Sequence, residues 1–302
     1  MRVVRKICLL LLIVPVLAFG AEAEKAVPPG LNAETMKGLE LRPLGPAFMS
    51  GRISDIVLHP DNSNIKYVGV GSGGVFKTLN SGISWEPIFD SEGSYSIGCI
   101  TLDPNRPDTV WVGTGENVSG RHVGFGDGVY RSLDGGKSWT NMGLKKSEHI
   151  GMIRIDPRDS NIIFVAAQGP LWSGGGDRGL FKSVDGGKTW NKVLGAGEFT
   201  GVSEVLMDPR DPDVMYATTW QRLRTVASLM DGGPESGIHK STDGGNTWRE
   251  LKAGLPEDDM GKVGLAISPQ KPDVVYATIE LPGREGGFWR SGDSGETWEK
   301  RN

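Results

Sequence analysis

The stretch "KSVDGGKTWNKV" at residues 182–193 returns, with small changes, at four other places in the chain. The other copies are "KTLNSGISWEPI" (77–88), "RSLDGGKSWTNM" (131–142), "KSTDGGNTWREL" (240–251) and "RSGDSGETWEKR" (290–301). Their tryptophans are Trp85, Trp139, Trp190, Trp248 and Trp298, at intervals of 54, 51, 58 and 50 residues. A period of this length is typical of an architecture built from stacked, similar units.

Each period contains four strand-like segments. The stretch "ITLDPNRPDTVWVGTG" (100–115) reads as a strand, a proline-rich turn and a second strand, and equivalents occur in every period. A third strand such as "GVYRS" (128–132) leads into each motif, and a fourth begins at the tryptophan. Four antiparallel strands in about fifty residues are the pattern of a propeller blade. The predicted fold is therefore an all-β propeller of five four-stranded antiparallel blades. The predicted blades are 41–90, 91–144, 145–195, 196–254 and 255–302.

The chain stops as the fourth strand of the fifth blade begins, at "TWEKRN" (297–302). Because an unclosed propeller leaves strand edges open for unwanted pairing, we expect an incomplete or open ring. The sequence thus predicts an N-terminal fragment of a longer protein.

Residues 1–20 have the features of a cleavable signal peptide. The basic residues at its start are Arg2, Arg5 and Lys6. An apolar run over 7–19 follows, with small residues that predict cleavage near Gly20 or Ala23. We expect an exported protein, periplasmic or extracellular, with no membrane span after cleavage and a flexible lead-in over 21–40.

Composition narrows the classes of partner. Loss of the signal changes the net charge from −4 to −7, and no basic run interleaves with aromatic residues, which argues against nucleic acid. No cofactor is predicted. Cys99 is the one cysteine outside the signal, so it forms no internal disulfide, and its apolar surroundings predict a buried thiol.

The recurrent motif resembles the Asp-box, or BNR, repeat. Its central residues are Asn80, Asp134, Asp185, Asp243 and Asp293. Glycine supplies the positive φ that a compact strand reversal needs, and a carboxylate or amide accepts the backbone N–H groups that the turn leaves unpaired. Asn80 accepts the same bonds but cannot serve as a general acid or a carboxylate nucleophile. The motif is therefore interpreted as scaffold, with its tryptophan as an apolar cover.

Three loops are much longer than their equivalents. In a four-stranded meander, the loops between second and third strands and the connections between blades emerge on one face, opposite the repeat turns. These loops are expanded over 113–128, 167–179 and 218–237. Because function in a propeller usually lies on loops, we expect a site there.

The candidate ligand-binding residues come from these loops and from the blade connections. They are Arg52, Glu116, Asn117, Arg121, His149, Trp172, Asp177, Arg178, Trp220, Arg222 and Arg224. Arginines and tryptophans suit a glycan, an anionic group or a peptide. Alternatively, the loops only solvate a surface and the tryptophans cap blade edges. His122 and His149 lack the spacing of metal ligands, so no metal site is predicted.

The opening of the first blade, "LRPLGPAFMSGRISDIVLHPDNSNIKYVGVGSGGVFKT" (41–78), resembles exported bacterial proteins labelled sortilin-like or glycosyl-hydrolase BNR proteins. Sialidases carry an "RIP" motif, to which Arg52-Ile53-Ser54 is similar, but the rest of their arginine triad and their tyrosine nucleophile have no counterpart here. Xyloglucanases carry a catalytic aspartate in a "TDVGGxYR" segment, and "VGSGGVFK" (70–77) places Gly71 at that position. The second carboxylate of that pair belongs to another propeller, and the cysteine-rich module of sortilins has no counterpart either.

The predicted function is a secreted binding or scaffolding module that recognises a glycan, an anionic group or a peptide. The alternative is a glycoside hydrolase, xyloglucanase-like or sialidase-like, that acts on polysaccharide. Most glycoside hydrolysis needs two carboxylates, for which Glu116 and Asp177 are the candidates. A purely structural segment of a larger envelope protein is a third possibility.

Overall fold

The computed structural model describes residues 52–195 and 197–302, in which almost all regular structure is β-strand. The chain divides into two units, Met1–Pro43 and Leu44–Asn302, and the described residues belong to the second. The predicted signal peptide, the lead-in and the start of the first blade lie outside them.

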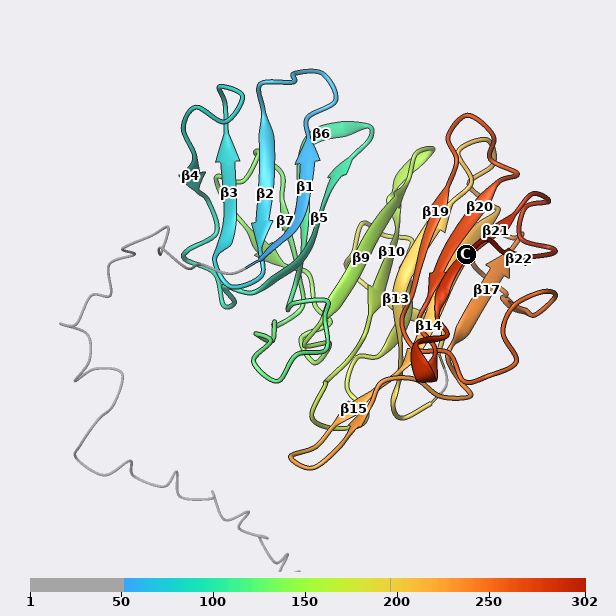
Figure 1. The fold of residues 1–302 in the computed structure, drawn as a ribbon. Coiled ribbons are helices and arrows are strands. Elements are labelled where there is room, and N and C mark those ends of the chain that lie inside the picture. Colours follow the sequence, from blue (N-terminus) through green and yellow to red (C-terminus); the bar gives the residue numbers. More distant parts are fainter. Residues whose placement is uncertain (1–51, 196) are drawn as a thin grey trace, which may run out of the picture. The chain divides into compact units, whose positions relative to one another are not determined.

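Five four-stranded antiparallel sheets follow one another along the chain (Figure 1). Blade one contains β1 (Ile53–Leu58), β2 (Lys66–Val70), β3 (Gly74–Thr78) and β4 (Glu86–Pro87). Blade two contains β5 (Ile97–Asp103), β6 (Arg106–Thr114), β7 (Val129–Ser132) and β8 (Thr140–Asn141). Blade three contains β9 (Ile150–Asp156), β10 (Asp159–Ala167), β11 (Gly179–Ser183) and β12 (Asn191–Leu194). Blade four contains β13 (Thr200–Met207), β14 (Met215–Gln221), β17 (Gly237–Ser241) and β18 (Arg249–Leu251). Blade five contains β19 (Val263–Ile267), β20 (Val275–Ile279), β21 (Gly287–Ser291) and β22 (Glu299–Lys300).

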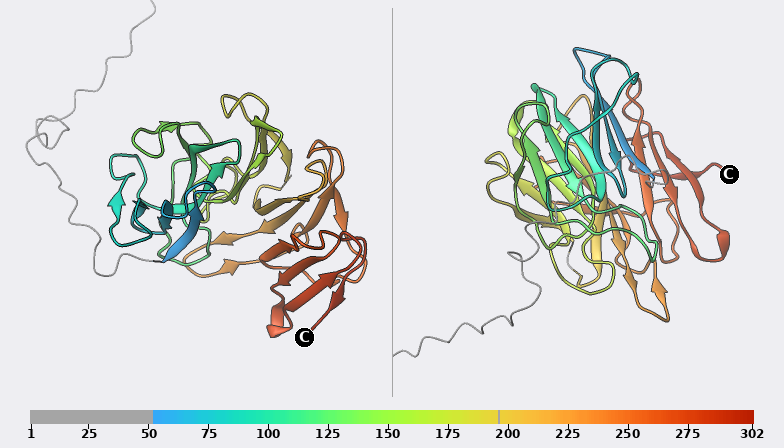
Figure 2. Two further views of the ribbon diagram at one scale, coloured as in Figure 1. Left: turned by 90° about the horizontal axis from the view of Figure 1, so that it is seen from above. Right: turned by 90° about the vertical axis from the view of Figure 1, so that its left-hand side faces the viewer.

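The first strand of each blade lies next to the first strand of the following blade. Contacts join β1 to β5, β5 to β9, β9 to β13 and β13 to β19. The sheets therefore follow one another in chain order about a common hub, as the view from above shows (Figure 2). The predicted fold, an all-β incomplete propeller of four-stranded blades, is confirmed.

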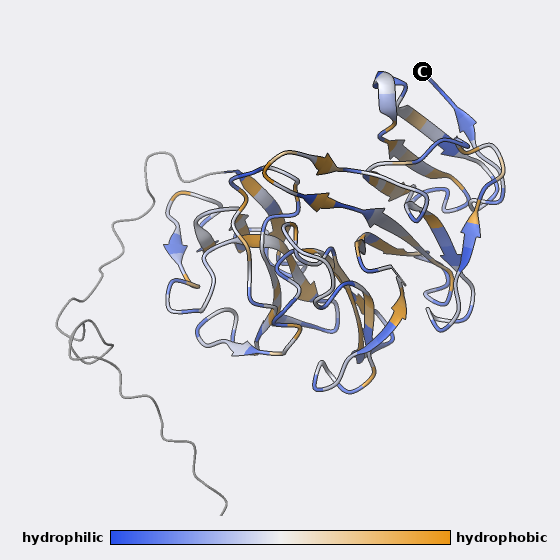
Figure 3. Cartoon of the chain, turned by 90° about the horizontal axis from the view of Figure 1, so that it is seen from below, coloured by the Kyte–Doolittle hydropathy of each residue, from blue (hydrophilic) through white to orange (hydrophobic). Residues whose placement is uncertain are grey.

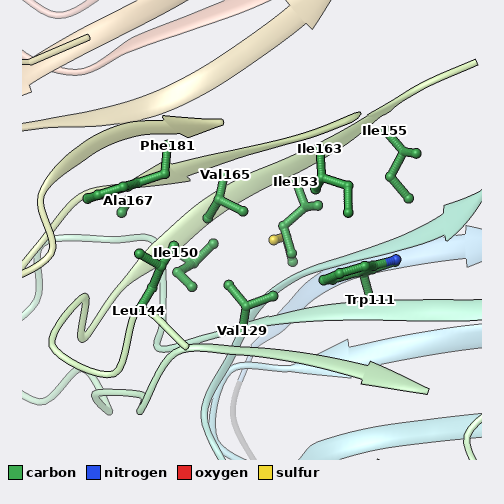
Figure 4. Close-up of a cluster of buried hydrophobic side chains, with 11 residues drawn as sticks. Trp111, Val129, Leu144, Ile150, Ile153, Ile155, Ile163, Val165, Ala167 and Phe181 are labelled. Carbon is green, nitrogen blue, oxygen red and sulfur yellow. The ribbon is translucent and has the colours of Figure 1, made fainter. Parts of the chain in front are cut away.

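The hydrophobic core lies between blades. One cluster joins blades two and three, where Trp111 and Val129 lie near Ile153 and Ile163 (Figure 4). Similar clusters fill the other junctions, and hydrophobic residues concentrate along the strands while hydrophilic ones dominate the turns (Figure 3). At about 25 cal/mol per Å² of apolar surface removed from water, these junctions are the main source of stability. Cys99 is buried in this core as predicted, and burial raises the pKa of its thiol.

The five recurrent turns between third and fourth strands use their central side chains for hydrogen bonds within the turn. In blade three, Asp185 Oδ1 accepts from Ser183 Oγ (2.8 Å) and Thr189 N (2.9 Å). In blade one, Asn80 Oδ1 accepts from Ser84 N (2.9 Å), while its Nδ2 donates to Ser84 Oγ (2.9 Å). Carboxylate and amide thus do the same structural task.

Two local features differ from the prediction. The fourth strands are short and begin one residue after the tryptophan, as β12 does after Trp190. The loop between β14 and β17 contains a ribbon of two strands, β15 (Leu223–Arg224) and β16 (Leu229–Met230). Thr225 closes this ribbon, because its N–H donates to Ser228 O at 2.8 Å.

Candidate functional site

The three expanded loops meet on one face, which we call the loop face. They follow the second strands of blades two, three and four and span 115–128, 168–178 and 222–236. Arg222 Nη1 donates to Val118 O (3.3 Å) and its Nη2 donates to Gly169 O (3.1 Å), so one side chain joins all three loops. The expectation that the insertions share one side of the propeller is confirmed.

The loop of blade two extends as far as blades four and five. Ser119 Oγ donates to Asp231 Oδ2 at 3.2 Å, and Arg224 Nη2 donates to Ser119 O at 3.0 Å. Lys262, at the start of blade five, donates from Nζ to Asn117 O at 2.5 Å. Backbone carbonyls of an irregular loop therefore find their donors in side chains of distant blades, as buried peptide groups require.

Two of the predicted binding arginines donate their hydrogen bonds to backbone carbonyls. Arg222 is 0% exposed, and its guanidinium lies 4.8 Å from the ring centre of the buried Trp220. Arg178 is also buried, and donates to Gln168 O (2.8 Å), Ser173 O (3.0 Å) and Pro170 O. Burial, followed by the charge of Arg178, lowers the pKa of Arg222 to about 9. Arg178, Trp220 and Arg222 therefore hold the loops together and expose almost no surface to a ligand.

Glu116 and Arg52 form a pair beside Gly71. Arg52 Nη2 lies 2.6 Å from Glu116 Oε1, and Gly124 N donates to Glu116 Oε2 at 3.2 Å. The Glu116 side chain is 3% exposed, whereas that of Arg52 is half-exposed. A Cβ atom at Gly71 would lie 2.3 Å from Glu116 Oε1. The carboxylate from blade two therefore fills the space that any side chain at Gly71 would need.

The remaining predicted site residues have separate partners. His149 is buried, its Nδ1 lies 2.7 Å from Glu116 O, and burial lowers its pKa to about 3. Asn117 Nδ2 donates to Gly98 O (3.3 Å), and the exposed Arg121 donates to Val226 O (3.3 Å). Asp177 Oδ2 accepts from Lys146 N at 2.8 Å. Glu116 and Asp177 thus hold different backbone groups, and no contact in the described residues joins them as an acid and base pair.

Exposed aromatic rings accompany these loops. Tyr95 is 66% exposed, Phe125 71% and Trp172 48%. Ser94 Oγ donates to Phe125 O at 3.4 Å, which places the loop segment carrying Phe125 beside the one carrying Tyr95. Of these rings, Trp172 is among the residues that the sequence analysis predicted on this face. Phe125 was missed, although a large apolar side chain in the glycine-rich "HVGFGDG" (122–128) is itself a signal of exposure.

A pocket that the sequence did not reveal opens between blades four and five. Its volume is about 330 Å³, and its lining residues are Asp231, Gly232, Asp259, Gly261, Glu280, Leu281 and Pro282. The last two belong to or flank η1 (Pro282–Arg284), in the loop between β20 and β21. Asp231 Oδ1 is buried and has no hydrogen-bond partner within the described residues. Burial, then the charge of Glu280, raises the pKa of Asp231.

The hub contains a partly buried group of charged side chains. Burial raises the pKa of Glu204 on β13 to about 7, while the charges of Lys262 and of Arg154 on β9 oppose that rise. Burial likewise lowers the pKa of Lys262.

Residues 52–195 and 197–302 contain no cluster of three or more His, Cys, Asp or Glu side chains placed to hold a metal ion. The same residues include no helix long and apolar enough to cross a membrane.

The described blades share their fold with β-propeller enzymes designated GH74, and no family model matches the chain. The crystal structure of an ancestral GH74 enzyme superimposes with a TM-score of 0.64 at 22% identity, over 83% of this chain and 31% of that one. A xyloglucanase from Paenibacillus sp is 24% identical over 278 residues, which are 82% of this chain and 26% of the enzyme. A photosystem II assembly lipoprotein, Ycf48, from Picosynechococcus sp. is 28% identical over 182 residues, half of each chain. The chain spans about a quarter of the xyloglucanase's length.

Proposed function

We propose that this chain is the polysaccharide-binding propeller of a xyloglucanase-type glycoside hydrolase, and that it binds a neutral β-glucan chain across the loop face. The observation that carries the proposal is the combination, on one face, of exposed aromatic rings with a carboxylate-lined pocket. Ligand sites commonly combine apolar rings with a few polar groups that fix orientation.

The aromatic rings supply the flat apolar surfaces that sugar rings require. Tyr95, Phe125 and Trp172 expose large aromatic areas on the loop face. Exposed apolar patches often mark binding sites, and the segments that carry Tyr95 and Phe125 lie side by side. The axial C–H groups of a β-linked glucose ring form an apolar face that stacks on an aromatic ring, so these residues support a glycan ligand.

The charges on this face favour a neutral glycan over an anionic ligand. Arg178 and Arg222 are already bound to carbonyls, and Arg52 is paired with Glu116. The pocket carboxylates of Asp231, Asp259 and Glu280 would repel an anion but accept hydrogen bonds from sugar hydroxyls. Of the ligands predicted for a binding module, these charges favour a glycan and disfavour an anionic group.

Hydrolysis is the second candidate function. It is favoured by the names of the relatives, xyloglucanases, and by the pocket, where Asp231 with its raised pKa lies near Glu280. A glycosidase needs one carboxyl group kept protonated and another ionised. In this proposal Asp231 is the acid candidate and Glu280 the base candidate, in place of Glu116 and Asp177.

The finer features of the sequence fit the same proposal. We infer that the recurrent turns are Asp-box repeats, since their aspartates bond within the turn. We also infer export, because plant-type polysaccharides are met outside the cell.

Calorimetric titration with xyloglucan oligosaccharides tests binding, and release of reducing ends from xyloglucan tests hydrolysis. We expect Asp231→Asn and Glu280→Gln to weaken binding, and to abolish any sugar release. Arg284→Ala, an exposed change beside the pocket, is the control and should alter neither. A wild-type protein that binds no β-glucan, or that binds a peptide through the same face instead, would refute the proposal.

A further inference from the structure

Four consecutive backbone carbonyls in the loop of blade two each accept a hydrogen bond from a side chain in a later part of the chain. We call this segment, residues 116–119, the strap. The four bonds run from His149 Nδ1 to Glu116 O (2.7 Å), from Lys262 Nζ to Asn117 O (2.5 Å), from Arg222 Nη1 to Val118 O (3.3 Å) and from Arg224 Nη2 to Ser119 O (3.0 Å). Each peptide group of the strap therefore has a fixed place, although the strap belongs to no strand.

Two donors of the strap also contact the frame of the pocket between blades four and five. The Arg222 guanidinium lies 4.8 Å and Lys262 Nζ lies 5.4 Å from the ring centre of Trp220. The same indole donates from Nε1 to Asp231 O at 3.4 Å, and Lys262 directly follows the pocket residue Gly261. The same side chains thus fix the position of the strap and that of the pocket.

The walls of the pocket approach each other closely through their backbones. Gly261 N donates to Glu280 O (2.9 Å), and Gly233 N donates to Met260 O (3.2 Å). A Cβ atom at Gly261 would lie 2.8 Å from Asp231 O, so a side chain there would displace the backbone of Asp231. With the backbone held in this way, the orientation of the Asp231 carboxylate depends on its side-chain contacts.

One hydrogen bond orients that carboxylate, and it comes from the strap. Ser119 Oγ donates to Asp231 Oδ2 at 3.2 Å, across 112 positions of sequence. In residues 52–195 and 197–302, Asp231 Oδ1 is buried and has no partner. The hydroxyl of Ser119 is therefore the side-chain contact that holds the Asp231 carboxylate in one orientation.

Charges of both signs act on the Asp231 carboxylate. Asp259 and Glu280 line the pocket with it, and the cations that act on it are Arg222, Arg224 and Lys262. Burial, then the charge of Glu280, raises the pKa of Asp231, whereas the hydrogen bond from Ser119 opposes that rise because it stabilises the ionised form. Loss of this bond would leave both oxygens of Asp231 without a donor.

We propose that Ser119 is a positioning residue of the pocket: it orients the Asp231 carboxylate for a ligand, so that the strap of blade two determines the affinity of a pocket built by blades four and five. The inference rests on the glycan binding proposed above. A sugar hydroxyl then meets a carboxylate whose Oδ2 is held and whose Oδ1 is left to accept its hydrogen bond. A group that is already oriented lowers the conformational cost of binding.

A pH titration of the protein without ligand, followed by nuclear magnetic resonance, tests the orientation of Asp231. The full chain carries an isotope label at the aspartate carboxyl carbons, and the Asp231 signal is identified by its absence in Asp231→Asn. We expect Ser119→Ala to raise the titration midpoint of Asp231, and Ser119→Thr, which keeps a hydroxyl, to restore the wild-type midpoint. Ser72→Ala, which removes an exposed hydroxyl from the corresponding loop of blade one, is the matched control and should leave the midpoint unchanged.

Calorimetric titration with xyloglucan oligosaccharides measures the effect on binding. Loss of one hydrogen bond predicts an affinity about three- to ten-fold lower in Ser119→Ala, with wild-type affinity in Ser119→Thr and Ser72→Ala. Equal affinity in Ser119→Ala and the wild type overturns the proposal. So does an unchanged Asp231 midpoint in Ser119→Ala, whether or not the wild type binds glycan. A wild type that binds no glycan refutes the proposed function instead, and the midpoint alone then decides whether Ser119 orients Asp231.

Discussion

Lys240 Nζ lies 2.7 Å from the Ser294 carbonyl oxygen across the junction between blades four and five, and the same ammonium lies 2.7 Å from Glu296 Oε1. The Lys240 side chain is almost fully buried. The methylene stem packs in the junction while the charge is satisfied by the neighbouring blade, so one residue ties two sheets together.

Lys240→Met keeps the stem and removes the charge. We expect the free energy of unfolding to fall by about 1.5–3 kcal/mol, the usual contribution of a hydrogen bond to a charged group. Urea denaturation at pH 7 measures it. Lys252→Met, which removes an exposed partner of Glu250, should cost less than about 1 kcal/mol. Equal losses in the two variants would contradict a special role for the junction.

The aspartates of the recurrent turns should make the fold sensitive to acid. Hydrogen bonds from Thr189 and Ser183 lower the pKa of Asp185 to about 2, below the unfolded value of about 3.9. A lowered folded pKa adds stability above the unfolded pKa, and that stability is lost as the pH falls through the folded value.

Asp185→Asn should therefore weaken the protein at pH 7 but flatten the decline in stability between about pH 5 and about pH 2. Far-UV circular dichroism during acid titration follows this. Asp61→Asn, at an exposed position outside the recurrent turns, is the control. If the Asp185 variant lost stability at low pH in the same way as the wild type, the hydrogen bonds in the turn would not favour the ionised Asp185 carboxylate.

Glu204 should have the opposite effect on the pH dependence of stability. Burial raises the pKa of Glu204 in the folded protein to about 7. Its contribution to the free energy of unfolding is therefore fully present below the unfolded pKa of about 4.3, and is lost as the pH rises through 7. Relative to the wild type, Glu204→Gln should gain stability between pH 5 and pH 8, by at most about 3 kcal/mol at 1.4 kcal/mol per pKa unit. Urea melts at both pH values measure the difference. The exposed Glu257→Gln should show no such trend, and a flat difference for Glu204→Gln would contradict the assignment.

Arg222 should stabilise the loops rather than contact ligand. Arg222→Met preserves bulk over Trp220 but leaves the carbonyls of Val118 and Gly169 without a donor. The expected loss is about 2–6 kcal/mol, since each of the two carbonyls left unsatisfied costs about 1–3 kcal/mol. Faster amide exchange over 115–128 should accompany it. The exposed Arg121→Met should change neither quantity by much. Unaltered exchange in the Arg222 variant would mean that the loops hold together without it.

The fold was predictable because its signals are local and repeated. The turn motif around Asp185 determines a hairpin through bonds to residues within four positions, and five copies define the blade period. The placement of the expanded loops followed from connectivity alone. Burial of Arg222 was not predictable, because its acceptor at Val118 lies 104 positions away in the sequence. From sequence alone, an arginine is predicted to lie on the surface. Its burial depends on carbonyl acceptors that only the folded chain brings close to it.

The pocket was hidden for a similar reason. Asp231 and Glu280 belong to loops of different blades, and neither carries a motif. Their proximity arises only when blades four and five pack together. The same packing buries Asp231, and this burial, followed by the charge of Glu280, raises the pKa of Asp231.

Glycan binding on the loop face is tested most directly by comparing two half-exposed tryptophans on opposite faces, Trp172 on the loop face and Trp85 at a recurrent turn. Calorimetric titration with xyloglucan oligosaccharides should show affinity reduced about ten-fold or more in Trp172→Ala, a loss of about 1.4 kcal/mol. Trp85→Ala should bind like the wild type. Equal affinity in Trp172→Ala and the wild type, or a loss confined to Trp85→Ala, would contradict binding through the loop face.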